Sequence, residues 1–178
     1  MIRLFAAVAV PDEIGMGLIA RQGGIEGATW RPLDALHITL RFFGDIREDV
    51  ARDLDAALIQ TEGRPFSLTV SGAGAFGEGA DLHAVWAGVE ESEPLRRLAK
   101  ACESAARRDG IMPETRTYRP HVTLAYLRRA SGFEVAHWIQ ANNLLQSPKF
   151  EVSSFGLYSS WPTSEGSRYR LEAEYPLQ

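Results

Sequence analysis

The stretch His37-Ile38-Thr39-Leu40 recurs 84 residues later, with one conservative change, as His121-Val122-Thr123-Leu124. Both copies are rich in β-branched residues, which predicts two strands. In a strand, residues i and i+2 point to the same face, so each copy presents a histidine beside a threonine. The chain has only four histidines, and two of them lie in this pattern. Two histidines with hydroxyl neighbours are the groups that acid–base chemistry on a phosphate requires.

The segments around the two motifs follow one order, which is helix, histidine strand, helix, strand, strand, with an extra strand at the N-terminus. Helical spacing predicts helices over residues 11–21, 47–61, 93–108 and 133–142. Apolar and β-branched runs predict strands over residues 2–10, 36–43, 66–70, 82–89, 119–127, 149–159 and 167–175. We expect Gly44 to end the first motif strand and residues 72–79 to form a glycine-rich connection.

The spacing within the two halves predicts a duplication. His37 precedes Trp86 by 49 residues, and His121 precedes Tyr169 by 48. Two copies of one unit, at about residues 11–90 and 91–178, can pack around an approximate twofold axis and bring their histidine strands together across a cleft. The paired strands that end both halves favour antiparallel sheets, although a parallel doubly wound sheet is the alternative. No linker divides the chain, so we expect residues 1–178 to form a single domain.

Composition excludes several classes of protein. A net charge of −4 over 178 residues argues against a long basic groove that grips many phosphates. Cys102 is the single cysteine, so neither a disulfide framework nor a thiolate metal cluster is expected, and its apolar neighbours predict a buried residue. The apolar run over residues 4–10 is too close to Met1 for a signal peptide, and no segment suits a membrane span. We therefore expect a cytoplasmic protein that does not bind membranes.

Histidine suits the expected chemistry because its ordinary pKa of about 6.5 lets it donate or accept a proton near neutrality. In phosphoester hydrolysis, a base removes a proton from water while an acid protonates the departing oxygen. Threonine hydroxyls beside the imidazoles can donate to the phosphate oxygens, where charge accumulates. The alternative is that both threonines are only β-forming residues.

Other polar candidates are weaker. Asp34 and Asp45 flank the first motif, but a zinc site needs three or four ligands and the alternating partner here is threonine, so we expect no metal. We interpret His83 and His137 as structural or exposed, because neither lies in the His-x-Thr pattern.

Three aromatic residues and one glycine-rich segment are also ambiguous. Trp30, Phe43 and Tyr126 could stack on a base, although we favour a place in the core or at its rim. Residues 72–77 lack the strand–turn–helix context of a dinucleotide-binding loop, so we interpret them as a turn or a bulge.

The chain resembles the two-histidine phosphoesterase superfamily and, within it, the RNA 2′,3′-cyclic phosphodiesterases, also called 2′-5′ RNA ligases or LigT-like proteins. Besides the two motifs, the resemblance covers residues 3–7, 30–44, 72–76, 85–89, 118–125 and 157–160. It implies a bilobal α+β fold of two antiparallel β-sheets, with helices on the outside, an active cleft between the lobes, and neither metal nor cofactor.

The resemblance assigns roles to the motif residues. His37 would be the general acid, His121 the general base, and Thr39 and Thr123 would hold the phosphate. Many relatives have an arginine five residues after the second histidine, where this chain has Tyr126.

Two arginines could take the place of the missing one. Arg128 and Arg41 are expected on the site's face by strand alternation, and a solvated surface charge is the alternative for each. We count Tyr126 with these two arginines among the candidate phosphate-binding residues.

The function implied is hydrolysis of a terminal 2′,3′-cyclic phosphate on RNA to a 2′-phosphate, with 2′-5′ ligation as the reverse reaction. The partner would be an RNA 3′ end or an oligonucleotide, and we expect a monomer. One alternative is the same chemistry on a nucleotide such as ADP-ribose cyclic phosphate. Another is a nucleotide- or RNA-binding module without turnover, which would not need both imidazoles.

Overall fold

A computed structural model describes the whole chain, residues 1–178. Its helices are α1 (Asp12–Ile19), α2 (Glu48–Ile59), α3 (Glu93–Arg108) and α4 (Gly132–Asn142). Its strands are β1 (Ile2–Ala9), β2 (Ala28–Trp30), β3 (His37–Ile46), β4 (Phe66–Leu68), β5 (Val70–Phe76), β6 (Ala84–Val89), β7 (His121–Leu127), β8 (Phe150–Val152), β9 (Ser154–Thr163) and β10 (Gly166–Pro176). All strand pairs are antiparallel. The predicted α+β class is confirmed, and the doubly wound alternative is wrong.

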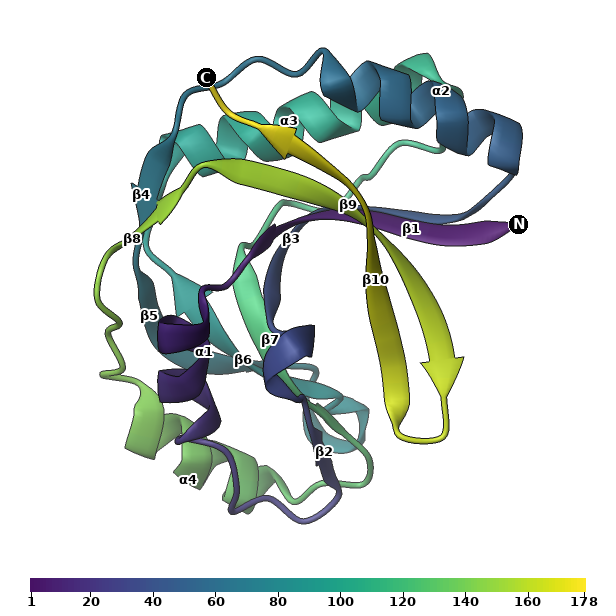
Figure 1. The fold of residues 1–178 in the computed structure, drawn as a ribbon. Helices are drawn as coiled ribbons and strands as arrows, with labels where there is room; N and C mark the ends of the chain where they lie inside the picture. Colours follow the sequence, from purple (N-terminus) through teal and green to yellow (C-terminus); the bar gives the residue numbers. More distant parts are fainter.

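The strands divide into two antiparallel halves that meet at the histidine strands. One half has the order β10-β9-β1-β3, and the other has β7-β6-β5 with β2 beside β7. Between β3 and β7 the single pair Ile38–Val122 joins the halves into one eight-stranded sheet. A separate two-stranded sheet forms from β4 and β8. Figure 1 shows α2 and α3 over one part of the molecule, α1 and α4 over the other, and the β9–β10 hairpin projecting from the body.

Each half is assembled from distant parts of the sequence. The β5–β6 hairpin pairs with β7, which follows it, whereas the C-terminal β9–β10 hairpin pairs through β1 with β3. Strand β3, from the first expected repeat unit, therefore lies in the same half of the sheet as the β9–β10 hairpin of the second unit. Strand β7, from the second unit, lies with the β5–β6 hairpin of the first unit. This interlocking explains why the sequence contains no linker between its two halves.

One residue is inserted into each histidine strand directly after the threonine. The register of β3 with β1 skips Leu40, and the register of β7 with β6 skips Leu124. Such a β-bulge reverses the alternation of the residues that follow it. The two strands consequently share one burial pattern, in which the sixth residue, Phe42 or Tyr126, is exposed.

The structure corrects two of our expectations about glycine-containing segments. Gly44 does not end the motif strand, which continues to Ile46 through a second irregularity, and Gly44 adopts a φ of 82° that suits glycine. Residues 72–76 belong to strand β5 rather than to a connection. A bulge is confirmed in that strand, where the register shifts between Val70 and Ala73.

Several expected boundaries also change. The single strands expected over residues 66–70 and 149–159 are each divided, into β4 and β5 and into β8 and β9. The short strand β2 lies between the helix expected to end at residue 21 and the strand expected to begin at residue 36, where we expected no element.

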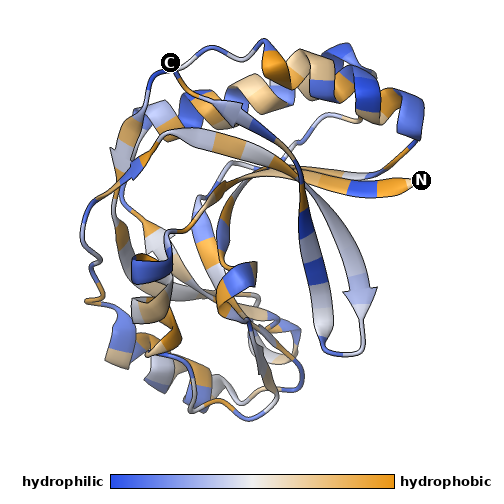
Figure 2. Cartoon of the chain, viewed as in Figure 1, coloured by the Kyte–Doolittle hydropathy of each residue, from blue (hydrophilic) through white to orange (hydrophobic).

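The core lies between the sheet and the helices. Helix α3 packs on β3 and α4 packs on β5. The stripe of α3 that spacing predicted, Leu95, Leu98, Ala99 and Cys102, is buried, and each fully buried leucine contributes about 1.5–3 kcal/mol. Figure 2 shows the helices with hydrophobic and hydrophilic sides, and the projecting end of the β9–β10 hairpin largely hydrophilic.

Two further expectations concerned Cys102 and membrane spans. Burial raises the pKa of the Cys102 thiol to about 12, as expected of an inert core residue. None of the helices combines the length and the apolar character needed to cross a membrane.

Candidate active site

The two His-x-Thr motifs meet at the residue pair that joins the halves of the sheet. Ile38 and Val122 are directly opposed in an antiparallel register. That register places His37 across from Thr123 and His121 across from Thr39. Opposed side chains on one face of a sheet have Cβ atoms about 5 Å apart. The structure thus brings all four residues into one half-buried cluster, while the intervening side chains are buried in the core.

Each imidazole is oriented by a backbone carbonyl two residues before it. Nδ1 of His37 lies 2.8 Å from the carbonyl oxygen of Ala35, and Nδ1 of His121 lies 2.6 Å from that of Arg119. A carbonyl oxygen only accepts, so Nδ1 carries the hydrogen in both rings. Nε2 is then the atom available for proton transfer. In the neutral ring of His37, Nε2 accepts a 3.0 Å hydrogen bond from the hydroxyl of Thr39.

Aromatic rings pack edge-on against both histidines. Tyr169 of β10 lies perpendicular to His37, with ring centres 5.1 Å apart. Phe76 of β5 lies nearly perpendicular to His121, with ring centres 4.8 Å apart. Phe5 also contacts His37, and Trp86 also contacts His121. Both rings are therefore held on two sides in the same manner, which limits each histidine to one orientation.

Burial makes both histidines less basic than usual. It lowers the pKa of His37 to about 4, against the opposing effect of the bond to Ala35, and the positive charge of Arg31, together with that of His121 when His121 is protonated, lowers it further. Burial also lowers the pKa of His121, against the effect of the bond to Arg119. Both rings are therefore neutral at pH 7 in the free protein. An anionic group bound between them would favour their protonated forms.

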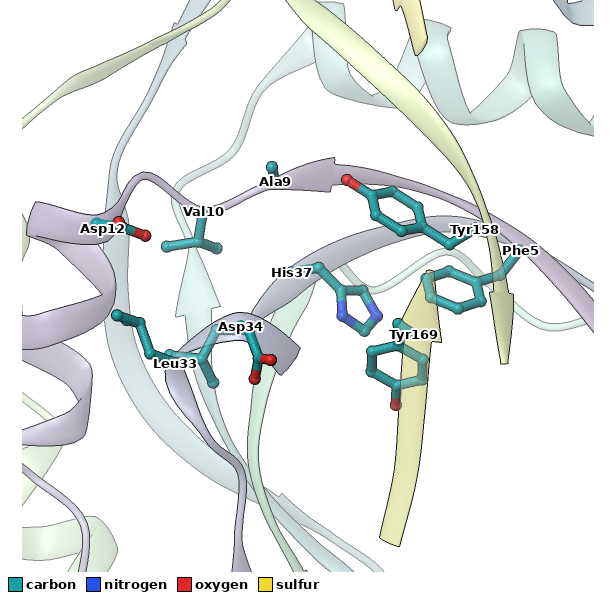
Figure 3. A pocket seen from close by; sticks show the side chains of 10 residues that line it. Phe5, Ala9, Val10, Asp12, Leu33, Asp34, His37, Tyr158 and Tyr169 are labelled. Atoms are coloured by element: carbon teal, nitrogen blue, oxygen red, sulfur yellow. The ribbon is translucent and has the colours of Figure 1, made fainter. Parts of the chain in front are cut away.

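A pocket of about 200 Å³ opens beside His37 (Figure 3). Aromatic side chains form one wall, with Phe5, Tyr158 and Tyr169 grouped around the imidazole, and the acidic residues Asp12 and Asp34 lie on the other side. The pocket does not include His121, so it forms one side of the site.

Arg41 does not face the site, which corrects the prediction from strand alternation. It is 7% exposed, and its guanidinium binds the carboxylate of Glu103 on α3 and the carbonyl oxygens of Phe42 and Met112. The bulge at Leu40 is the reason, because it turns Arg41 to the helix-covered side of the sheet.

The bulge at Leu124 has the opposite consequence for Tyr126. It returns Tyr126 to the inner face, where the side chain is 46% exposed and its ring lies 5.6 Å from the guanidinium carbon of Arg31. Arg128 lies just beyond the end of β7 and is exposed, and its backbone N–H donates to Gly27. Of the three candidates for the phosphate position, only Tyr126 lies on the same strand face as His121 and Thr123.

The weaker candidates lie outside the cluster. Asp45 forms an exposed ion pair with Arg3, and Phe43 is buried under Arg41. Trp30 packs against Trp138 at a ring distance of 5.9 Å. The remaining histidines, His83 and His137, are both exposed. No three side chains of histidine, cysteine, aspartate or glutamate gather in one place.

Sequence reasoning missed two residues of the inner face, Arg31 and Tyr169. The nearly equal spacings, 49 residues from His37 to Trp86 and 48 from His121 to Tyr169, were a signal for Tyr169, because both aromatics contact a motif histidine. Arg31 lies in a segment for which neither a helix nor a strand was expected, and no periodicity identifies it.

Known proteins are similar to this chain in sequence and in fold. The sequence pattern of the 2′-5′ RNA ligase superfamily matches residues 21–160. This chain belongs to that superfamily. Similar proteins include the RNA 2′,3′-cyclic phosphodiesterase of Archaeoglobus fulgidus, which is 29% identical over 171 residues, or 94% of this chain and 96% of that protein. The protein of the same name from Escherichia coli is 35% identical over 135 residues, or 72% and 73% of the two chains.

Solved structures of similar proteins agree with the fold. E. coli LigT complexed with 3′-AMP superposes with a TM-score of 0.81 at 27% identity, over 99% of this chain and 98% of that one. TT0787 of Thermus thermophilus also reaches a TM-score of 0.81, at 23% identity and with 98% and 97% coverage, and it supports the fold alone. The resemblance expected from the sequence is confirmed.

Proposed function

We propose that this chain hydrolyses terminal 2′,3′-cyclic phosphates of RNA, leaving a 2′-phosphate. The observation that carries the proposal is the pairing of two oriented imidazoles with two hydroxyls across the Ile38–Val122 junction. The names of its relatives support the choice of substrate. Retention of both imidazoles disfavours a module that only binds.

The proposed reaction adds one water molecule and breaks one P–O bond. Nε2 of His121 takes a proton from water as the water oxygen attacks phosphorus. Nε2 of His37, protonated, delivers its proton to the 3′ oxygen as the P–O3′ bond breaks. In-line displacement requires the two groups to act from opposite sides of the phosphate. The family resemblance, rather than the geometry, assigns the two roles.

Once Nε2 of His37 is protonated, it no longer accepts from the hydroxyl of Thr39, so the hydroxyls of both Thr39 and Thr123 can donate to the non-bridging phosphate oxygens. Each threonine is opposite the histidine of the other motif, so a phosphate between the rings has one hydroxyl on either side. Such donors act where negative charge develops in the transition state. Tyr126 is on the same face and close enough to contact the rest of the nucleotide, whereas the exposed side chain of Arg128 is a place for the RNA backbone.

The test is turnover of 2′,3′-cyclic nucleotides and oligonucleotides, with the product assigned by phosphorus NMR. We expect a 2′-phosphate and at least about a 10²-fold loss of turnover in His37→Ala and in His121→Ala. His137→Ala, at an exposed position on α4, is the matched control and should leave turnover unchanged. A 3′-phosphate product would reverse the assigned direction of ring opening.

A substrate with an activated leaving group separates the two roles. A nitrophenyl phosphodiester needs little protonation of its leaving oxygen, so it should partly rescue His37→Ala but not His121→Ala. Rescue of His121→Ala instead would exchange acid and base.

We also propose an internal repeat, a cellular compartment, an oligomeric state and an RNA partner for this chain. We infer that an internal repeat, at about residues 11–90 and 91–178, produced the two motifs within one domain. We further propose a cytoplasmic monomer that acts on RNA 3′ ends, with 2′-5′ ligation as the reverse reaction. Sedimentation analysis showing a stable dimer would contradict the monomer.

A further inference from the structure

Two arginines of this chain are buried, and only one of them is neutralised. Arg41, 7% exposed, forms an ion pair with Glu103. Arg31 is 2% exposed, and no carboxylate lies within ion-pair distance of it. Its guanidinium donates to the backbone carbonyl of Ser167 at 2.6 Å and to the hydroxyl of Tyr169, and neither acceptor carries a charge. A buried charge without a counter-ion is costly, so an anion from outside the chain would stabilise it strongly.

The backbone places Arg31 at the junction of the two histidine strands. Its N–H donates to the carbonyl oxygen of Leu124 at 2.8 Å, in continuation of the pairing between β2 and β7. Leu124 directly follows Thr123, which lies across from His37. The chain then passes from Arg31 through one short turn into His37. Arg31 therefore lies beside both motifs.

The side chain of Arg31 is held on the inner face by two strands of different halves. Its guanidinium carbon lies 5.6 Å from the ring centre of Tyr126 on β7 and 5.5 Å from that of Tyr169 on β10. Gly166 at the hairpin end leaves room for it, because a Cβ there would lie 2.7 Å from Nη1. Tyr169 is the ring that packs edge-on against His37. The charge is thus fixed next to the proposed phosphate site.

We propose that Arg31 supplies the positive charge that attracts and stabilises the phosphate in this chain. This inference rests on the proposed function for its role in turnover. The guanidinium acts through a water-poor interior, where a charge is felt more strongly than at the surface. It also holds Tyr169 in place against His37, so it is a positioning residue for the acid as well as a source of charge. Arg31 lowers the proton affinity of His37 in the free protein, and a bound phosphate offsets that effect.

The experiment combines removal and relocation of the charge. Arg31→Met keeps an unbranched side chain but removes the guanidinium and its charge, and it should lower kcat/KM for a 2′,3′-cyclic nucleotide by about 10²-fold. Arg31→Lys should retain part of the activity. In the double variant Arg31→Met with Tyr126→Arg, the charge returns from the neighbouring position, and kcat/KM should recover at least about tenfold. Arg170→Met, on the same hairpin with a 73% exposed side chain, should match the wild type.

Two readouts other than turnover separate charge from structure. Inorganic phosphate, titrated while the histidine signals are followed by NMR, should bind more weakly to Arg31→Met. In the absence of phosphate, the pKa of His37 should rise in the same variant, because a nearby positive charge has been removed. Loss of activity that neither Arg31→Lys nor the double variant restores would show a structural role and overturn the proposal, as would unchanged phosphate affinity and kcat/KM in Arg31→Met.

The experiments distinguish failure of the proposed function from failure of the proposed role of Arg31. If the wild type opens no cyclic phosphate, that function is wrong. Phosphate affinity still decides the role of Arg31 in that case: weaker binding in Arg31→Met supports it, and equal binding overturns it.

Discussion

At the scale of the residue, the site depends on the backbone as much as on its histidines. One carbonyl oxygen before each ring fixes the tautomer, and one aromatic ring on its edge fixes the orientation. The same burial that fixes the rings lowers the pKa of both. The free protein therefore holds two neutral imidazoles, and the anionic substrate must favour the protonation that the reaction needs.

This balance predicts the pH dependence of activity. The pH profile of kcat/KM reports the ionisations of the free enzyme. Burial disfavours the charged form of each ring, so both limbs of this bell-shaped profile should lie below about pH 6.5, the ordinary pKa of histidine. The profile of kcat reports the bound state, in which the phosphate raises the pKa of both rings, so its bell should lie at higher pH. Initial rates from about pH 4 to 9 provide the measurement. Coincident profiles centred above about pH 7 would contradict the assignment of burial as the dominant cause.

The hydroxyls can be tested by isosteric replacement. Thr39→Val and Thr123→Val keep the shape of the side chain but remove a donor, so each should cost about 1–3 kcal/mol of transition-state stabilisation. This loss would be measured as a decrease in kcat/KM, with Thr115→Val at an exposed position as the control. Wild-type kinetics in both variants would leave the threonines as strand-forming residues only.

At the scale of the element, the decisive feature is the bulge that follows each His-x-Thr. It leaves the first three residues of the strand in regular alternation and reverses the residues after them. Arg41 is consequently buried against α3, while the residue five positions after each histidine returns to the inner face. The local twist that a bulge adds also lets β3 and β7 diverge after their single shared pair.

A glycine in β5 supports the second histidine. Gly74 pairs with Trp86, and a Cβ at Gly74 would overlap the indole ring that contacts His121. Gly74→Ala should therefore lower the free energy of unfolding by about 1–3 kcal/mol and reduce turnover with it. Gly17→Ala is the control, because nothing lies within 4 Å of its Cβ position in α1, and this change should stabilise the protein by about 0.5–1 kcal/mol. Denaturant unfolding measures both, and equal effects would contradict the proposed overlap.

At the scale of the whole molecule, elements that are distant in the sequence are held together by long-range polar contacts as well as by the core. The ion pair of Arg41 with Glu103 ties β3 to α3, and Glu103 also accepts from the backbone of Glu114. On the inner face, Arg31 links β2 to the hairpin of the other half. Both arginines cross between elements that are far apart in the sequence.

The buried pair predicts a difference between two otherwise similar substitutions. Glu103→Ala leaves Arg41 buried without a counter-ion and should cost about 3–5 kcal/mol of stability. Asp45→Ala breaks the exposed pair with Arg3, whose side chains are each 52% exposed, and should cost at most about 1 kcal/mol. Urea unfolding at neutral pH compares them. Equal losses would show that burial of the pair has no energetic consequence.

The sequence by itself determined the four helices, most strands and the two His-x-Thr motifs whose four residues lie together in the structure. These features are local, because helical and strand periods, glycine positions and a repeated tetrapeptide are all read within a short window. The placement of each histidine on the same face as its own threonine also followed, since alternation holds for the three residues from each histidine to its threonine.

Only the tertiary structure decided what lies around that cluster. A bulge depends on the register with a partner strand, so the sequence of β3 alone could not show that Arg41 turns away. Nor could it show that Arg31 is buried on the inner face, because the residues that cover it come from a hairpin 136 positions later in the chain. Local patterns specify which residues are polar or apolar, whereas the pairing of distant strands decides which of them share a site.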